Sequence, residues 1–165
     1  MPEAESIQNI INILSLEPHI EGGYFRRTYA AEPENGKCFA SSIYYLLTAQ
    51  SPVGHLHRNR SDIIHYFHSG QSFRYTLIDT QGNLSTVTLG NNIDQGETPQ
   101  LLVKGGYWKA SELLIDQTDP EQYGLISEAV VPGFNYQDMQ IATGHDLLTL
   151  WPQHQNTLQH LIKKA

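Results

Sequence analysis

Cysteine is nearly absent from this chain of 165 residues, because Cys38 is the only one. A single thiol excludes an internal disulfide and is typical of a protein from a reducing compartment. Long apolar runs are absent too, since none approaches the roughly 20 residues that a membrane span requires. The acidic start of the chain lacks the basic segment of a secretory signal. We therefore expect a cytoplasmic protein with no membrane partner.

Positive charge is scarce as well. Ten Lys and Arg residues stand against seventeen Asp and Glu residues, which gives a formal net charge of -7. Phosphate backbones are bound by clustered positive charge, so this balance argues against a nucleic-acid partner. The sequence also lacks the glycine-rich loops that bind nucleotides and the serine elbow of the α/β-hydrolases. These absences exclude several common classes of enzyme site.

The spacing of apolar residues predicts the secondary structure at the start of the chain. Ile7, Ile10 and Leu14 recur at the interval of a one-faced helix. They predict a helix over residues about 4–16, and Pro18 would prevent its continuation.

The pattern changes over residues from about 20 to about 152. Short β-rich runs such as SSIYYLLT and FRYTLID alternate there with turn signals such as DTQGN and VPGFN. Many short strands with frequent turns are typical of an all-β sandwich or barrel, and a jelly roll fits best. Leucine and isoleucine near the C-terminus predict a short closing helix over about 153–163. Without a linker or a repeat, we expect a single domain over residues 1–165.

Histidine is concentrated in one stretch. Four of the eight histidines lie in GHLHRNRSDIIHYFHSG, residues 54–70. Because side chains alternate along a strand, His55 and His57 are expected to share one face. On the next run, His65 and Tyr66 are expected on opposite faces, so imidazoles from two strands could converge. Imidazole is a common metal ligand, but a half-buried strand histidine often needs only a hydrogen bond, and both interpretations remain open.

Two other segments hold polar groups beside turn glycines. In EGGYFRRTY, Glu21 precedes two glycines, and either Arg26 or Arg27 could hold a ligand carboxylate or phosphate. In VVPGFNYQDM, Asp138 follows two aromatic residues that could line a cavity. The plainer interpretation is a glycine bend, surface arginines and a β-turn with core aromatics. Trp108 is similarly either a core residue or a stacking wall.

Six segments together resemble a known family. In chain order they are PHIEGGYFRRTY, SSIYYLLT, HRNRSDIIHYFHSG, LVKGGYWKA, VVPGFNYQDM and LLTLWP. They resemble the cupin superfamily, and more closely its cupin 5 branch, from about residue 19 to about residue 152. The resemblance implies a double-stranded β-helix, which is a jelly-roll barrel with a pocket inside, usually in a homodimer. It implies no settled reaction, because fold does not fix function.

The chain departs from the metal motif that the resemblance implies. His55 and His57 match its H-x-H pair, but Ile63 stands where the acidic ligand belongs and Lys109 where the last histidine belongs. An apolar side chain offers no lone pair, and an ammonium repels a cation. A divalent metal is therefore disfavoured by Ile63 and Lys109, and the cofactor is unknown. The best remaining arrangement is a site of His55, His57 and His65 with open positions.

We therefore predict a protein that binds a small polar metabolite, sugar- or carboxylate-like, in its barrel. Whether it is an enzyme stays open. Metal-free isomerase or epimerase chemistry fits best, with His57 as base, Tyr66 as acid and Lys109 stabilising an oxyanion. The expected ligand-binding residues are Glu21, Tyr24, Trp108 and Asp138. Two alternatives remain: a metal-dependent cupin oxygenase or isomerase with a histidine-centred site, and a non-catalytic ligand-sensing dimer.

Overall fold

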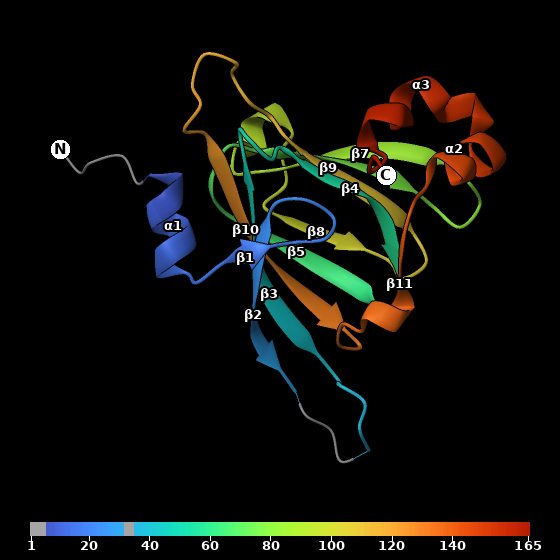
Figure 1. Cartoon of the computed structure of the whole chain (residues 1–165), viewed down its shortest axis with the longest axis horizontal. Helices are drawn as coiled ribbons and strands as arrows, with labels where there is room; N and C mark the ends of the chain where they lie inside the picture. Colours follow the sequence, from blue (N-terminus) through green and yellow to red (C-terminus); the bar gives the residue numbers. More distant parts are fainter. Residues whose placement is uncertain (1–5, 32–34) are drawn as a thin grey trace.

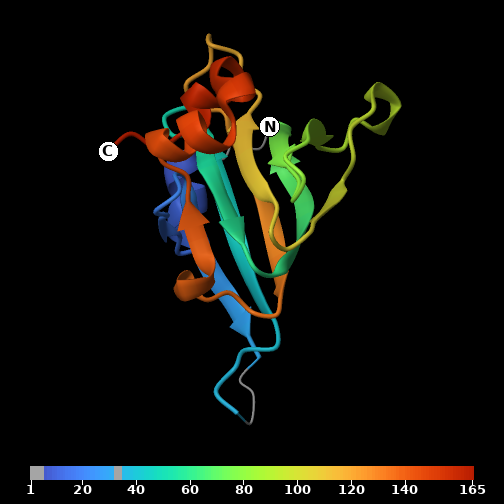
Figure 2. The same ribbon diagram turned by 90° about the vertical axis from the view of Figure 1, so that its right-hand side faces the viewer.

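Two antiparallel sheets lie face to face and enclose the interior of the protein (Figures 1 and 2). The computed structural model describes residues 6–31 and 35–165. The six-stranded sheet has the order β1-β2-β3-β10-β5-β8, and the five-stranded sheet has the order β11-β4-β9-β6-β7. Short helices lie at both ends of the chain. The predicted all-β double-stranded β-helix with terminal helices is confirmed.

The six-stranded sheet consists of β1 (Glu17–Pro18), β2 (Tyr24–Ala30), β3 (Ser41–Thr48), β10 (Tyr123–Val131), β5 (Asp62–Gly70) and β8 (Gln100–Val103). The five-stranded sheet consists of β11 (Met139–Ile141), β4 (Val53–Asn59), β9 (Trp108–Leu113), β6 (Phe73–Ile78) and β7 (Leu84–Leu89). The α-helices are α1 (Ile7–Ile13), α2 (Gly144–Leu150) and α3 (Gln155–Leu158). The short 3-10 turns are η1 (Ile93–Gln95), η2 (Tyr136–Asp138), η3 (Pro152–His154) and η4 (Gln159–Leu161).

The interior of the barrel is apolar at one end and polar at the other. Strand β10 shows the alternation that builds it, because Gly124, Ile126, Glu128 and Val130 are buried while their neighbours are not. The apolar end is filled by Tyr45, Leu47, Phe73, Tyr75, Leu77, Leu89, Val103, Leu113 and Ile126. This packed end leaves the space around Glu128 for polar side chains.

The N-terminal helix is shorter than predicted. Helix α1 begins after Ser6, whose hydroxyl accepts a hydrogen bond from the backbone N–H of Asn9 at 3.2 Å. Its buried residues Ile7 and Ile10 face the sheet, and Ile10 packs with Leu46 of β3. The predicted start at residue 4 lies outside the described residues. No helix in the described part of the chain is long and apolar enough to cross a membrane.

The C-terminal segment covers the outer face of β4 and β9 with several short helices rather than the one predicted. Pro152 explains the break, because it disfavours a helical conformation at the preceding Trp151, where α2 ends. The indole of Trp151 packs edge-to-face on Trp108 with the ring centroids 5.0 Å apart. Leu158 and Leu161 are fully buried in the same cluster. The segment therefore acts as a second apolar core outside the barrel.

We predict that Leu158→Ala lowers the free energy of unfolding by about 2–5 kcal/mol, because it leaves a cavity in this outer core. Leu148 of α2 is the matched control, since its side chain is 58% exposed. Leu148→Ala should change the free energy of unfolding by less than about 0.5 kcal/mol. Urea unfolding of the two variants and the wild type measures both values. Equal losses in the two variants would contradict the role of the C-terminal segment as a core.

Candidate functional site

A β-bulge in β4 decides which side chains enter the barrel. Gly54 pairs with Ser111 of β9 and His57 pairs with Lys109, so three steps on β4 oppose two on β9. The extra residue reverses the alternation. His57 is therefore buried inside the barrel, while Leu56 belongs to the outer core under the C-terminal helices. The predicted shared face of His55 and His57 is wrong for this reason.

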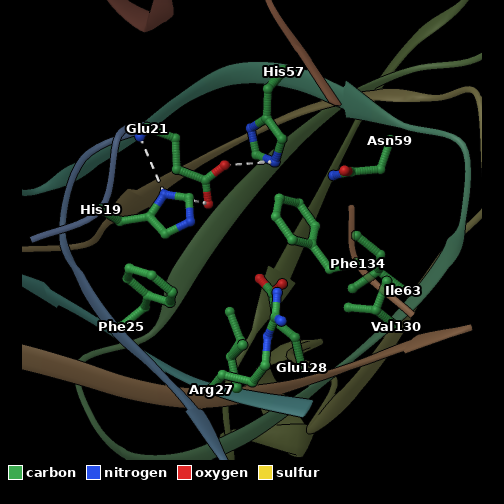
Figure 3. Close-up of a pocket in the computed structure, with 11 residues that line it drawn as sticks. His19, Glu21, Phe25, Arg27, His57, Asn59, Ile63, Glu128, Val130 and Phe134 are labelled. Atoms are coloured by element: carbon green, nitrogen blue, oxygen red, sulfur yellow. Dashed lines mark hydrogen bonds and ion pairs between the residues drawn. The ribbon is translucent and has the colours of Figure 1, made fainter. Parts of the chain in front are cut away.

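His55 instead fastens a neighbouring segment to β4. Its Nδ1 lies 2.8 Å from the backbone oxygen of Glu21, and its backbone N–H donates to the same oxygen at 2.6 Å. Gly22 and Gly23 follow with positive φ angles of 104° and 70°, which residues with side chains rarely adopt. The two glycines thus turn the chain so that the Glu21 side chain points into the barrel (Figure 3).

The polar end of the barrel encloses a small cavity (Figure 3). It is lined by His19, Glu21, Phe25, Arg27, Ile43, His57, Asn59, Ile63, Glu128, Val130 and Phe134. About 30 Å³ is open to the centres of water molecules. This is room for about two waters, so only a small chemical group fits inside the cavity as it stands.

Glu21 and His57 form a buried pair on the cavity wall (Figure 3). His57 Nδ1 lies 2.7 Å from the backbone oxygen of His55, so this nitrogen donates. His57 Nε2 lies 2.9 Å from Glu21 Oε2, and both side chains are about 5% exposed. Burial raises the pKa of Glu21, but the charge and hydrogen bond of His57 lower it further, so the net shift is downward. Because His57 Nδ1 donates to the His55 oxygen, the contact between Nε2 and Glu21 Oε2 is a hydrogen bond in which the two groups share one proton.

His19 presents a hydrogen-bond donor to the cavity. Its Nδ1 accepts from the backbone N–H of Glu21 at 3.2 Å, which places the ring hydrogen on Nε2. Nε2 points into the cavity (Figure 3). Burial lowers the pKa of His19 despite the nearby carboxylate of Glu21, so the ring is neutral at pH 7.

Asn59 has one buried polar atom without a protein partner. The residue is only 8% exposed, and its Oδ1 is buried with no hydrogen bond to any residue that the structure describes. Its amide lies on the cavity wall near His57 (Figure 3). A buried polar atom without a partner costs stability, and Oδ1 can accept a hydrogen bond from a group in the cavity.

A second charged group lies at the base of the cavity. Lys109 Nζ lies 2.6 Å from His65 Nε2 and 3.4 Å from Glu128 Oε1, and all three residues are buried. His65 Nδ1 lies 3.1 Å from the backbone oxygen of Leu101 and donates to it, so Nε2 accepts from the ammonium. Burial and the charge of Lys109 lower the pKa of His65. Burial raises the pKa of Glu128, but Lys109 and His65 more than offset this and hold it well below its usual range.

Comparison with known proteins identifies the family. A family model described as "Cupin superfamily (DUF985)" matches residues 8–142. The chain belongs to the Cupin_5 family. The resemblance that the sequence motifs carry is therefore confirmed.

Similar proteins include one sequence relative and several solved structures with this fold. An uncharacterized protein of Saccharomyces cerevisiae, YML079W, is 38% identical over an alignment of 165 positions, and the match covers 90% of this chain and 81% of that protein. The crystal structure of Protein SO0799 from Shewanella oneidensis is 34% identical with a TM-score of 0.89, and the match covers 98% of this chain and 100% of that one. Oxalate decarboxylase from Bacillus subtilis is 17% identical with a TM-score of 0.56, covering 88% and 34% of the two chains. At that identity the likeness shows the barrel fold alone.

The donor set of this cupin does not fit the metal site that the superfamily motif implies. Ile63 lines the cavity without a lone pair, and the Lys109 ammonium already occupies the accepting nitrogen of His65. The three-histidine arrangement is not formed either, because His55 faces away from His57. Among residues 6–31 and 35–165, no group of three or more His, Cys, Asp or Glu side chains is placed to hold a metal ion.

The predicted site residues divide between the cavity and other places. Glu21 and His57 meet on the cavity wall, and Lys109 lies just beneath it. Tyr66 faces away from the barrel, as the alternation on β5 indicates, so it cannot act beside His57. Trp108 lies in the outer core and packs on Trp151.

Tyr24 and Asp138 also lie outside the cavity. Tyr24 packs with the N-terminal helix on the outer face of the six-stranded sheet. Asp138 lies near the mouth of the barrel, where it forms an ion pair with Arg60 at 3.5 Å.

Three polar cavity residues were not singled out by the sequence analysis. Glu128 had a readable signal, because it interrupts an alternating apolar face with a carboxylate. Asn59 follows His57 by two residues and shares its face. The sequence does not show that this face is the inner one, because that depends on the bulge. His19 has no local signal, since it lies in a loop whose path depends on the two glycines.

We predict that Lys109→Met lowers the free energy of unfolding by about 3–5 kcal/mol at pH 7, because Glu128 would remain buried and charged without its partner. Lys104→Met is the control. Lys104 and Asp62 are also 3.4 Å apart, but their side chains are 60% and 43% exposed. Loss of that surface pair should cost about 1 kcal/mol or less. Urea unfolding separates the two cases, and similar losses would show that burial does not strengthen the dependence on Lys109.

Proposed function

We propose that this cupin binds a small polar metabolite, sugar- or carboxylate-like, in the barrel cavity and moves a proton on it without a metal, as isomerases and epimerases do. The observation that carries the proposal is the buried contact of 2.9 Å between His57 and Glu21. A carboxylate and an imidazolium that share one proton can accept a proton at one atom and return it from the other.

The neighbouring groups support this proposal by their chemistry. His19 offers an N–H and Asn59 offers an amide, and both line the cavity beside His57. A ligand carbonyl would accept the N–H of His19 while Glu21 accepts a proton from the adjacent carbon, and a ligand hydroxyl would donate to Asn59 Oδ1. His57 would then donate to the oxygen that gains charge. The acid that the sequence suggested, Tyr66, is replaced in this proposal by the imidazolium of His57.

Hydrogen exchange tests the proposal. Small hydroxyaldehydes, hydroxyketones and keto acids are incubated with the protein in D₂O, and deuterium entry beside the carbonyl is followed by proton NMR. We expect wild-type exchange with at least one compound, and losses of at least ~100-fold in His57→Asn and Glu21→Gln. His68→Asn is the control, because His68 is exposed and bonds Ser127 Oγ at 2.6 Å outside the cavity. It should exchange at the wild-type rate.

Two outcomes would overturn the proposed chemistry. A compound that binds in the cavity without exchanging would favour the ligand-sensing alternative. Exchange that EDTA abolishes and an added divalent metal restores would favour the metal-dependent alternative.

We also propose that the protein is a cytoplasmic homodimer, with the outer face of the six-stranded sheet as the interface. Leu102 and Val131 on this face are each 49% exposed. Ile64 of β5 pairs with Leu102 on one side and Ala129 on the other, so three apolar side chains form a row across the sheet. Helix α1 packs only at the end of this face. A second copy would bury the row and shield its edges.

We predict that Leu102→Asp gives a monomer, because a carboxylate at the β8 end of the row would be desolvated in the dimer. The wild type should scatter light as a particle of twice the 18.6 kDa chain mass. Leu148→Asp is the control, since Leu148 is exposed on α2, which covers the other sheet. It should remain a dimer, and a wild type that scatters as a monomer at micromolar concentration would contradict the assembly.

A further inference from the structure

A second cleft opens at the mouth of the barrel, and we call it the outer cleft. The residues that line it include Arg27, Lys37, Arg60, Phe134, Tyr136 and Asp138. Arg27 and Phe134 line both the outer cleft and the inner cavity, so the two spaces adjoin. About 770 Å³ is open in the outer cleft, against about 30 Å³ in the cavity. A metabolite-sized ligand that reaches His57 is too large for the cavity alone, and the outer cleft has room for the rest of it.

The outer cleft is positively charged in a negatively charged protein. Arg27, Lys37 and Arg60 line it and are three of the ten Lys and Arg residues of the chain, whose net charge is -7. Asp138 is the only carboxylate among the described residues that line it, and it pairs with Arg60 at 3.5 Å. Arg27 and Lys37 are left as the cations of the cleft. Such a local reversal of sign attracts anions.

Arg27 is the best placed of these cations. It comes from β2 and lies on the side of the cavity away from His57 (Figure 3). Its neighbour Arg26 faces the other side of the strand, where its guanidinium lies 5.7 Å from the ring centre of Tyr44. A guanidinium binds a phosphate or carboxylate through two parallel N–H bonds. Phe134 provides an apolar wall where the cavity and the outer cleft adjoin. Its ring packs edge-to-face on Tyr136, with the ring centroids 4.8 Å apart.

We infer that the ligand is anionic, with a phosphate or carboxylate group held by Arg27 and Lys37 in the outer cleft and its reacting end in the cavity. This inference rests on the proposed function for the position of the reacting end. The anion site itself is formed by other residues, so the two can be tested separately.

The test titrates inorganic pyrophosphate and, separately, malonate into the ¹⁵N-labelled full chain and follows the arginine Nε–Hε signals. We expect one signal, absent in Arg27→Gln, to shift on titration. Arg27→Gln should weaken binding of the tighter anion at least ~10-fold, because it removes a charged two-bond contact. Arg26→Gln should weaken it less than ~2-fold, since Arg26 faces away from the cleft. The tighter of the two anions identifies the group as phosphate or carboxylate.

Two results would overturn the inference: no shift of the Arg27 signal with either anion up to about 10 mM, or equal losses in Arg26→Gln and Arg27→Gln. Failure of the proposed function looks different. If anion binding depends on Arg27 but no compound exchanges deuterium, the anion site is supported and the proposed proton transfer is contradicted.

Discussion

The ammonium group of Lys109 is the interaction on which the polar interior depends. It comes from β9 of the five-stranded sheet and contacts His65 of β5 and Glu128 of β10 in the six-stranded sheet. A buried charge is tolerated only when its partners compensate for lost hydration. Lys109 therefore joins the two sheets and fixes the ionisation of the groups beneath the cavity. Glu128 can line the cavity as a carboxylate because this cation lies behind it.

The same lysine changes the chemistry that the barrel can support. It stands where the superfamily motif would supply a histidine, and its ammonium uses the lone pair that His65 would otherwise offer. The positive charge beside His65 is thus supplied by the Lys109 side chain. The remaining acid–base capacity lies across the cavity, in the pair of His57 and Glu21. The charges of Lys109 and Glu128 compensate each other on one side of the cavity, and His57 and Glu21 share a proton on the other.

The sequence predicts the fold better than the site. Alternation, turn signals and the order of six motifs are sufficient for a jelly-roll barrel, because they depend on local chemistry repeated many times. Glu21 and His57 were predicted because each belongs to a distinctive local motif. Tyr24 and Trp108 were misplaced, because an amphipathic aromatic reads alike whether it faces a cavity or an outer core. The bulge in β4 has no signature in the sequence beyond Gly54, whose missing side chain leaves room for Tyr45 and Ser111.

That bulge determines which side chains of β4 face the interior of the barrel. Without the extra residue, Leu56 and Arg58 would face inward in place of His57 and Asn59, since the pairing with β9 would advance by one. A deletion of one residue would exchange an imidazole and an amide for an isobutyl group and a guanidinium, with no substitution at all. In descendants of this barrel, the side chains that line the cavity can therefore change through single-residue insertions and deletions in β4. A comparison that counts only substitutions would record no change in such descendants.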